Sequence, residues 1–382
     1  MTTVLQVIPS MGAGGAEQAC IDVAAGLRVA GHRALVASSG GARVSEILRV
    51  GGEHIQRPVH SKNPTVIITN ALWLARFIRA QKIDVIHVRS RAPAWSAYIA
   101  CRMTGCAFIT TFHAAYKFSN PLKKFYNSVM AKADRIIAIS HFIGAHIENT
   151  YGVERVRIRV IPRGIDLDKF TPDKVSGESR NKLRKAWDIE EGQPLILFPS
   201  RLSPIKGQAE FIEAMARLPY GLKNVLAIIV GDDQGRVSYR RELENLIAAH
   251  GLQARVRLVP HCADMPATYS LAALAVAPSL VPEGFGRVPV EAMAMGVPAI
   301  ATDLGGFTET ISPGETGWLV PPNDTKKLAE AITAALTQTP EQRASMTHKA
   351  QQNVYAHYDK KKMVADTLKV YEELNGVRIQ RL

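Results

Sequence analysis

The chain contains 382 residues, with 47 Lys and Arg against 34 Asp and Glu, so its formal net charge is +13. At about 150 residues per domain this length indicates two domains or more, and 47% hydrophobic with 21% charged residues exclude a disordered chain. Its four cysteines are scattered and form no C-x-x-C pair, which favours a reducing, cytoplasmic setting. The first residues lack the pattern of a signal peptide, and no uncharged apolar run reaches the ~18 residues of a membrane span.

Short apolar runs rich in β-branched residues alternate with helical stretches along both halves of the chain. In the first half we expect strands at residues 4–8, 34–37, 85–88, 108–111, 136–139 and 160–161, with helices such as 16–30 and 69–81 between them. The second half repeats the pattern at residues 195–198, 226–230, 256–259, 275–277, 299–301 and 318–320. Continuous apolar runs are typical of parallel strands that helices cover on both faces.

This alternation predicts an α/β protein built from two Rossmann-like, doubly wound parallel-sheet domains. We place the first domain at residues 1–170, a polar linker at 171–192 and the second domain at 193–354. Open parallel sheets bind ligands beyond the carboxyl ends of their strands. Two such sheets that face each other would place their ligand-binding loops around one central cleft.

The positive charge is concentrated in the first half of the chain. Residues 1–175 hold 23 Lys and Arg and 11 Asp and Glu, a formal charge of +12, whereas residues 176–382 carry +1. A basic half favours an anionic partner such as a phosphorylated lipid or a membrane surface, although a merely solvated basic face has the same composition. Three arginines alternate along a strand-like run, which would place them on one face: Arg155, Arg157 and Arg159. Three lysines lie among aromatic residues in a pattern that suits a lipid headgroup interface, with an ordinary helix flank as the alternative: Lys117, Lys123 and Lys124.

The first expected strand leads into a glycine-rich turn that opens a helix, Gly12-Ala13-Gly14-Gly15-Ala16-Glu17. Glycines at such a turn let a ligand approach the backbone, and the N-terminus of the following helix favours a phosphate. The dinucleotide fingerprint needs Gly or Ala three residues after Gly14, where this chain has Glu17, so NAD binding is disfavoured. Gly14 and Gly15 are candidates for phosphate binding, and a plain turn is the alternative.

Arg201 and Lys206 follow the first strand of the second domain in a loop bounded by Pro and Gly. A guanidinium is a planar fork and an ammonium is a point charge, so the pair suits a diphosphate. A solvated loop is the alternative. The spacing of Lys206 and Gly207 differs from that of a P-loop, which disfavours hydrolysis of a nucleoside triphosphate.

The segment from Ser279 to Glu291 places two glutamates around a second glycine-rich turn. Glu283 precedes Gly284-Phe285-Gly286, and Glu291 follows on a helix whose first turn contains Pro289. Backbone N–H groups at a helix N-terminus suit a phosphate, and carboxylates accept hydrogen bonds from the vicinal hydroxyls of a sugar or a ribose. Glu291 would alternatively stabilise the helix as an acid near its N-terminus.

Together these motifs resemble the retaining glycosyltransferases of the GT-B fold that form glycosyltransferase family 4. The matching segments span the chain in the family's order: Gly14-Gly15-Ala16-Glu17, Thr111-Phe112-His113, Ile161-Pro162-Arg163-Gly164-Ile165-Asp166, Ser200-Arg201-Leu202 with Lys206-Gly207, and Glu283-Gly284-Phe285-Gly286 through Glu291-Ala292-Met293. The resemblance implies that the first domain binds the acceptor and the second binds the nucleotide sugar. It also implies that a C-terminal helix at about residues 355–382 packs back on the first domain.

The same resemblance implies roles for individual side chains. Arg201 and Lys206 would hold the donor diphosphate, and Glu291 would bind the ribose hydroxyls. Glu283 would contact the transferred hexose near its 3- and 4-hydroxyls, and His113 would face its 6-hydroxyl. Five backbone positions complete the expected donor site: Gly14, Gly15, Gly284, Phe285 and Gly286. Such enzymes retain anomeric configuration by front-face attack in which the leaving phosphate accepts the acceptor's proton, so the resemblance implies neither a metal ion nor a cofactor beyond the nucleotide-sugar substrate.

Two positions depart from the family pattern. Arg163 stands where the family usually has Asn, and we expect it, together with Glu17, to contact the acceptor or a phosphate or to affect the hinge. Pro260-His261-Cys262 replaces the usual Gly-containing turn close to where the family reads the nucleotide base, so His261 is a candidate base contact.

From the motifs and the charge we expect a hexosyltransferase that acts on an anionic glycolipid. The run at residues 111–121 resembles mannosyltransferases of lipopolysaccharide core assembly, which makes mannose transfer from GDP-mannose to the lipopolysaccharide inner core the best prediction. A UDP- or ADP-sugar donor for another surface glycan is an alternative, and a non-enzymatic protein that binds an anion or a nucleotide sugar is another. Nucleic acid is disfavoured as a partner, because no recognised module is present. We expect a cytoplasmic protein with peripheral contact at the inner face of the cell membrane through the basic domain.

Overall fold

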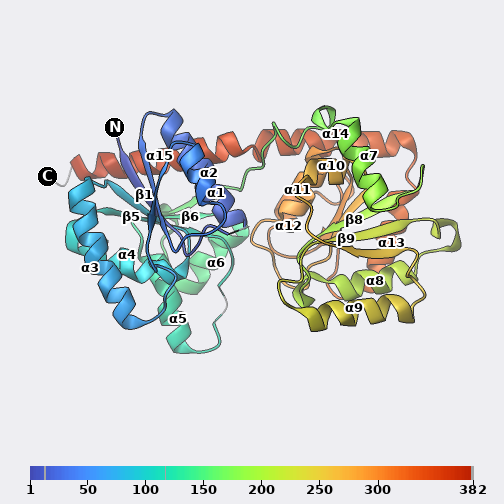
Figure 1. Cartoon of the computed structure of the whole chain (residues 1–382), viewed down its shortest axis with the longest axis horizontal. Coiled ribbons are helices and arrows are strands. Elements are labelled where there is room, and N and C mark those ends of the chain that lie inside the picture. Colours follow the sequence, from blue (N-terminus) through green and yellow to red (C-terminus); the bar gives the residue numbers. More distant parts are fainter. Residues whose placement is uncertain (13, 117, 380–382) are drawn as a thin grey trace. The chain divides into compact units, whose positions relative to one another are not determined.

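The computed structural model describes residues 1–12, 14–116 and 118–379, and it divides the chain into two compact α/β units. Unit 1 contains Met1–Arg163 and the segment from Lys360 onward, and unit 2 contains Gly164–Asp359. Each unit has its own parallel sheet with helices packed against it (Figure 1). Each also has its own hydrophobic core.

The sheet of unit 1 has seven strands in the order β3-β2-β1-β4-β5-β6-β7. Its strands are β1 Thr3–Val7, β2 Arg33–Ser38, β3 Glu53–Gln56, β4 Val85–Val88, β5 Ala107–Phe112, β6 Arg135–Ala138 and β7 Ile158–Val160. Its helices are α1 Gly15–Val29, α2 Val44–Arg49, α3 Pro64–Gln81, α4 Arg91–Thr104, α5 Pro121–Ser128, α6 His141–Tyr151 and α15 Lys360–Ile379, with 3-10 turns at Val129–Lys132 and Arg155–Arg157. The strand order reverses between β1 and β4, and ligands bind at such switch points in doubly wound sheets.

The last helix of the chain completes the core of unit 1. Helix α15 contacts α1, and its apolar residues Met363, Val370 and Leu374 are buried in the same cluster as Val4, Leu27 and other residues of the sheet and α1. Each such side chain contributes about 1.5–3 kcal/mol when it is fully buried. Glu373 of α15 also accepts hydrogen bonds from Arg135 of β6 and Arg159 of β7.

The sheet of unit 2 has six strands in the order β10-β9-β8-β11-β12-β13. Its strands are β8 Leu195–Pro199, β9 Leu226–Val230, β10 Val256–Val259, β11 Leu274–Ala277, β12 Ala299–Thr302 and β13 Trp318–Val320. Its helices are α7 Gly177–Ala186, α8 Gln208–Ala216, α9 Val237–Ala249, α10 Met265–Ser270, α11 Arg287–Ala294, α12 Phe307–Thr310, α13 Thr325–Leu336 and α14 Pro340–His357, with 3-10 turns at Pro172–Lys174, Pro204–Lys206 and Tyr220–Leu222. The switch point of this sheet lies between β8 and β11.

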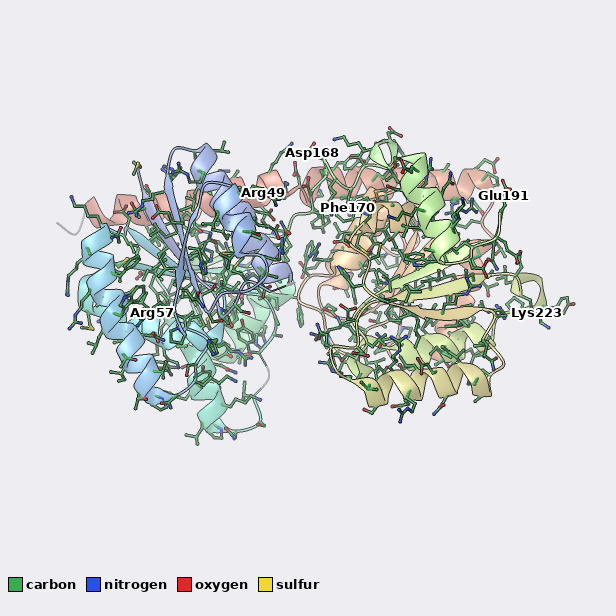
Figure 2. The ribbon with its side chains drawn as sticks, in the orientation of Figure 1. Arg49, Arg57, Asp168, Phe170, Glu191 and Lys223 are labelled. Atoms are coloured by element: carbon green, nitrogen blue, oxygen red, sulfur yellow. The ribbon has the colours of Figure 1, made fainter. Side chains whose placement is uncertain are left out.

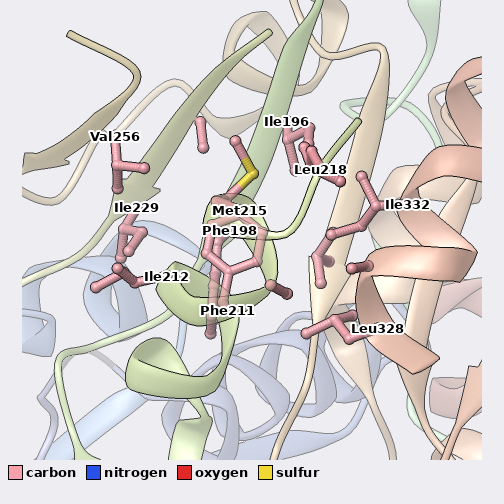
Figure 3. Close-up of a cluster of buried hydrophobic side chains, with 14 of the residues drawn as sticks. Ile196, Phe198, Phe211, Ile212, Met215, Leu218, Ile229, Val256, Leu328 and Ile332 are labelled. Carbon is pink, nitrogen blue, oxygen red and sulfur yellow. The ribbon is translucent and has the colours of Figure 1, made fainter. Parts of the chain in front are cut away.

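Aromatic and branched side chains from β8 and α8 fill the core of unit 2. Phe198 and Phe211 meet edge to face with ring centroids 5.3 Å apart, and Met215, Ile229 and Ile332 pack around them (Figure 3). All five side chains are almost fully buried. This core fixes the carboxyl ends of β8 and β11, where the candidate donor-binding loops begin.

The structure confirms the predicted fold class of two doubly wound parallel sheets, and each expected strand is present within one or two residues of its expected bounds. One strand was missed. β3 is a sheet-edge strand whose four residues are half-buried or exposed, and its sequence Glu-His-Ile-Gln lacks an apolar run. The shared cleft between the two sheets stays a prediction.

The expected common face of Arg155, Arg157 and Arg159 is wrong, because Arg155 and Arg157 lie on a 3-10 turn and only Arg159 lies on a strand. The turn aims the Arg157 guanidinium at the carbonyl oxygens of Ala131 and Ala133.

The observed division of the chain differs from the expected one at three places. Unit 1 ends at Arg163 and not at residue 170, because the Ile165 N–H donates to the Tyr358 carbonyl within unit 2. The expected linker at 171–192 contains α7 and belongs to unit 2. The C-terminal helix begins at Lys360 and not near residue 355, and residues 380–382 lie outside the described part of the chain.

No helix among the described residues is both long and apolar enough to cross a membrane.

Candidate functional site

The loop after β8 carries Arg201 and Lys206. Arg201 is exposed, and Lys206 closes the 3-10 turn Pro204–Lys206. Gly207 follows with a φ of +81°, and a Cβ at this position would lie 2.0 Å from the carbonyl oxygen of Pro278. Only glycine therefore lets the loop pack this closely against the end of β11.

Gln208 supports the same loop and lies outside the sequence motifs. Its buried amide donates to the Arg201 carbonyl at 2.9 Å and accepts from the Tyr239 hydroxyl at 3.3 Å. Because buried polar groups need partners, this amide fixes the backbone that presents Arg201. The available signal was a polar residue that opens the largely apolar helix α8.

Lys206 and Glu283 lie together although 77 residues separate them. The Lys206 ammonium and the Ser279 hydroxyl both donate to Glu283 Oε1, the latter at 2.8 Å. The two charged side chains are 21% and 26% exposed, so solvent reaches both. The structure therefore brings the expected diphosphate cation and the expected hexose carboxylate into one hydrogen-bonded group at the end of β11.

A pair of glycines after β12, outside the sequence motifs, contacts the backbone of Glu283. Gly305 pairs with Glu283 in an isolated bridge, and the Gly306 N–H donates to the Glu283 carbonyl at 2.8 Å. A Cβ at Gly305 would lie 2.5 Å from that carbonyl oxygen, and a Cβ at Gly306 would lie 2.5 Å from Phe285. Two adjacent glycines a few residues after a buried strand were the signal for this close approach.

The glycine turn after Glu283 ends at the N-terminus of α11. Gly286 caps the helix with a φ of +99°, while Phe285 is buried and Gly284 is half-buried. The first N–H groups of an α-helix have no partner within the helix and lie at its positive end. This end can therefore bind an oxyanion such as a phosphate.

Glu291 lies one to two turns into α11 and is only 6% exposed. Its Oε1 accepts from the Arg287 guanidinium at 2.5 Å, and its Oε2 accepts from the Tyr269 hydroxyl at 3.1 Å. Burial, reinforced by the charge of Glu291, raises the pKa of Tyr269 well above its ordinary value, so the hydroxyl stays a donor. A carboxylate has about four acceptor positions, which leaves Glu291 able to accept further hydroxyls.

His261 lies in the exposed turn after β10. Its backbone N–H donates to Asp232 Oδ1 at 3.2 Å, and the Asp232 carbonyl accepts from the Leu202 N–H at 2.9 Å. Asp232 thus connects the turn that carries His261 to the loop that carries Arg201.

The candidate residues of unit 1 meet at the carboxyl ends of its strands. His113 directly follows β5, and its Nδ1 lies 2.9 Å from an Arg163 guanidinium nitrogen beyond β7. A Cβ at Gly15 would lie 2.1 Å from that guanidinium, and a Cβ at Gly14 would lie 2.2 Å from the Glu17 carboxylate. The tips of the Glu17 and Arg163 side chains thus occupy the space beside the two glycines, and a Cβ at either glycine would displace such a tip.

Among the residues that the structure describes, no three His, Cys, Asp or Glu side chains come together as a metal site would require.

Two family descriptions match the chain. Residues 13–169 match the one described as Glycosyltransferase Family 4, and residues 179–353 match the one described as Glycosyl transferases group 1.

The chain is also similar to individual proteins. A glycosyltransferase from Rickettsia africae ESF-5 is 34% identical, with a TM-score of 0.90 and 98% of each chain covered. HepE from Anabaena, solved in complex with UDP-glucose, is 27% identical, with a TM-score of 0.84 over 97% of this chain and 100% of that one. The D-inositol 3-phosphate glycosyltransferase of Geodermatophilus obscurus is 34% identical over 215 residues, which are 54% of this chain and 46% of that protein. The chain spans between about half and two thirds of the length of the curated relatives that it matches.

Proposed function

This chain belongs to the family 4 glycosyltransferases of the GT-B fold, and we propose that it moves a hexose from a nucleoside diphosphate sugar to an anionic acceptor with retention of anomeric configuration. One observation carries this proposal. Lys206 and Ser279 both donate to Glu283 Oε1, immediately before the glycine turn that opens α11. A cation suited to a diphosphate and a carboxylate suited to a sugar hydroxyl therefore lie side by side at the end of one strand.

The Lys206–Glu283 pair suggests how the donor would bind. A diphosphate carries more negative charge than one carboxylate, so it would compete with Glu283 for the Lys206 ammonium. That exchange would release Glu283 Oε1 to accept a hydroxyl of the hexose. Arg201 and the N-terminus of α11 would bind the remaining phosphate oxygens, and Glu291 would accept the ribose hydroxyls.

In the proposed reaction the bond between the anomeric carbon and the β-phosphate oxygen breaks on the face that the acceptor oxygen attacks. The acceptor's proton passes to the leaving phosphate, so no side chain has to act as a nucleophile. Arg201 and Lys206 would stabilise the charge that develops on the leaving diphosphate. His113 would contact the transferred hexose.

For the donor, the resemblance at residues 111–121 favours GDP-mannose. A UDP-hexose is the second candidate, because HepE, at 27% identity, was solved with UDP-glucose. A thermal-shift panel of GDP-mannose, UDP-glucose, UDP-N-acetylglucosamine and ADP-heptose, with and without magnesium, separates them. A donor at 100 times its dissociation constant stabilises the protein by about 2.7 kcal/mol. Stabilisation by GDP-mannose or GDP alone would support mannose transfer, and a response to a UDP- or ADP-sugar alone would exclude it.

For the acceptor, the charge of +12 over residues 1–175 favours a phosphorylated molecule. A phosphorylated glycolipid such as the lipopolysaccharide inner core is our first candidate. An inositol phosphate is the second, because the matched curated relatives carry the name D-inositol 3-phosphate glycosyltransferase. Transfer assays with each acceptor, with and without its phosphate, would identify which one is used.

Helix α5 suits peripheral contact with an anionic membrane. Leu122 and Phe125 are 80% and 63% exposed, and Lys123 and Lys124 lie between them. Lys117 of the expected basic cluster lies outside the described residues. Exposed apolar side chains flanked by lysines bind bilayers that contain anionic lipids. Cosedimentation of the wild type with vesicles of phosphatidylglycerol, but not of phosphatidylcholine, and its loss in Leu122→Ser/Phe125→Ser, would support this contact.

The decisive test of the reaction is Glu283→Ala, with Glu330→Ala on the exposed face of α13 as the matched control. We expect Glu283→Ala to lower turnover by roughly 100-fold or more, as for loss of a transition-state contact, and to leave the dissociation constant of the free nucleoside diphosphate within a few-fold. NMR of the product should show the donor's anomeric configuration. A wild-type protein that binds the nucleotide sugar but releases no product with any acceptor would favour a binding protein instead.

A further inference from the structure

The hydrogen bond between Arg163 and His113 determines which imidazole nitrogen carries the proton. Arg163 Nη2 lies 2.9 Å from His113 Nδ1. A guanidinium can only donate, so Nδ1 must accept with its lone pair. A neutral His113 therefore carries its proton on Nε2.

The groups that surround His113 keep the ring neutral. Arg163 comes from the segment after β7, Arg89 follows β4, and His87 lies on β4. Burial first, then the charges of Arg163 and Arg89, hold the pKa of His113 well below its ordinary value, and His87 acts in the same direction. Burial likewise lowers the pKa of His87, whose nitrogens bind the Tyr371 hydroxyl of α15 and the Thr111 hydroxyl of β5 at 2.7 and 2.6 Å.

The Nε2 side of the ring is buried and has no hydrogen-bond partner among the residues that the structure describes. His113 lines a small cavity together with Arg89, Thr111 and Thr367. The space open to the centre of a water molecule is about 20 Å³, which is room for one ordered water. Because buried N–H groups are normally satisfied, this donor has to find its acceptor on a ligand or on a single water.

We propose that Arg163 is a positioning residue that holds His113 as the neutral Nε2–H tautomer, so that His113 donates a hydrogen bond to bound substrate, directly or through the single water that its cavity admits, and does not serve as a general base. The substrate role rests on the proposed function, whereas the tautomer does not. A donor at this position selects an atom with a lone pair, such as a hydroxyl or phosphate oxygen. A His113 that donates and does not accept a proton also agrees with a reaction in which the leaving phosphate takes the acceptor's proton.

The residue type at position 163 is what makes this arrangement particular to this chain. The amide of an Asn, usual at this position in the family, can both donate and accept, so it would not by itself select one tautomer. Arg163 can only donate. Gly15 provides the space, because a Cβ there would lie 2.1 Å from Arg163 Nη1.

The test reads the tautomer directly by long-range ¹⁵N–¹H NMR on protein labelled with ¹⁵N-histidine, with the His113 signals assigned by their loss in His113→Gln. We expect the wild type to show the Nε2–H pattern and to keep it unchanged from pH 8 to pH 5.5. Arg163→Met should give a mixture of tautomers whose midpoint of protonation moves upward. Arg163→Lys, which keeps a cationic donor, should restore the Nε2–H pattern. Arg49→Met, on the exposed face of α2, is the matched control and should change nothing (Figure 2).

Activity provides the second measurement. A misplacement of about 1 Å at a reacting site costs on the order of 100-fold in rate, so Arg163→Met should lower kcat by up to about that factor, and Arg163→Lys should recover most of it. A wild-type spectrum with the proton on Nδ1, or an unchanged pattern in Arg163→Met, would overturn the inference even if transfer activity is normal. A protein that shows the expected tautomer but transfers no sugar would refute the proposed function and leave the tautomer standing.

Discussion

Replacing Gly207 by alanine tests whether the loop that carries Lys206 depends on close contact with the end of β11. The substitution adds one methyl group at a residue with a φ of +81°. The new Cβ would lie 2.0 Å from the Pro278 carbonyl oxygen, a distance that real Cβ atoms do not show. The loop or the strand end must therefore shift by about 1 Å to reach even 3 Å.

Two separate costs contribute to the effect. A left-handed backbone costs a residue with a Cβ roughly 1–2 kcal/mol. Forcing extra atoms into a packed site costs typically about 1–3 kcal/mol more. We therefore expect Gly207→Ala to lower the free energy of unfolding by about 2–5 kcal/mol, the sum of these terms. A misplacement of about 1 Å at a reacting site costs on the order of 100-fold in rate, so turnover should fall with the displaced Lys206.

Gly192 offers a matched control in the same unit. Its φ is +74°, and apart from the adjacent residues no described part of the chain lies within 4 Å of a Cβ at this position. Gly192→Ala should therefore show the backbone cost alone and keep both turnover and the affinity for nucleoside diphosphate. Urea unfolding and calorimetric titration with the diphosphate would measure both variants. Equal losses of stability in the two variants, with unchanged nucleotide affinity, would refute the role of the Gly207–Pro278 contact.

Three further substitutions test the donor site, the C-terminal helix and the core. Tyr269→Phe removes a hydroxyl that donates to the buried Glu291, so it should destabilise the protein by about 1–3 kcal/mol and weaken nucleotide binding, as urea unfolding and calorimetry would show. Partial burial alone would raise the pKa of Glu373, but hydrogen bonds from Arg159 and Arg135 hold that pKa below its ordinary 4.5. The ionised Glu373 should therefore add about 0.5–1 kcal/mol to the free energy of unfolding. This contribution should be present above pH 4.5 and disappear as the pH falls through the lowered pKa. Unfolding of Glu373→Gln and wild type should therefore differ at pH 7 and converge in acid. Phe211→Ala in the core of unit 2 should cost about 3–5 kcal/mol, and a loss below 1 kcal/mol would contradict the packing in Figure 3.

The sheets could be predicted because their strands are buried on both faces. An uninterrupted apolar run such as Leu226–Val230 has one plausible place in an α/β protein, and its expected and observed bounds coincide. β3 gave no such signal, because an edge strand with exposed side chains has no need of apolar residues. The alternation of Arg155, Arg157 and Arg159 failed for a related reason. Residues of one kind at every second position indicate a strand only where one face of that strand is buried, and these arginine side chains are not fully buried.

The motifs also predicted the family correctly, but not the contacts inside the site. Glycine spacing and the order of the Arg, Lys and Glu residues are local properties of the sequence, so they can be read without a fold. The bond between Tyr239 and Gln208 spans 31 residues, and Gly305 and Gly306 contact a glutamate more than 20 residues earlier, so no local pattern identifies these partners. The mannose donor and the lipopolysaccharide acceptor stay predictions, because no motif in the sequence identifies the residues that would distinguish these ligands from similar ones.

Arg163 shows what the fold adds to a residue that the sequence had already singled out. The sequence marked it as a departure from Asn but could not name its partner, because 50 residues separate it from His113. His113 follows β5 and Arg163 follows β7, and only β6 lies between these two strands in the sheet. Because parallel strands end at the same edge, the two residues lie close together. At this edge Arg163 is half-buried and donates a hydrogen bond to one imidazole nitrogen of His113. If Arg163→Lys restores the tautomer and the activity that Arg163→Met loses, the departure at position 163 is a functional choice of a donor-only side chain; if Arg163→Met is as active as the wild type, position 163 has no role in the reaction.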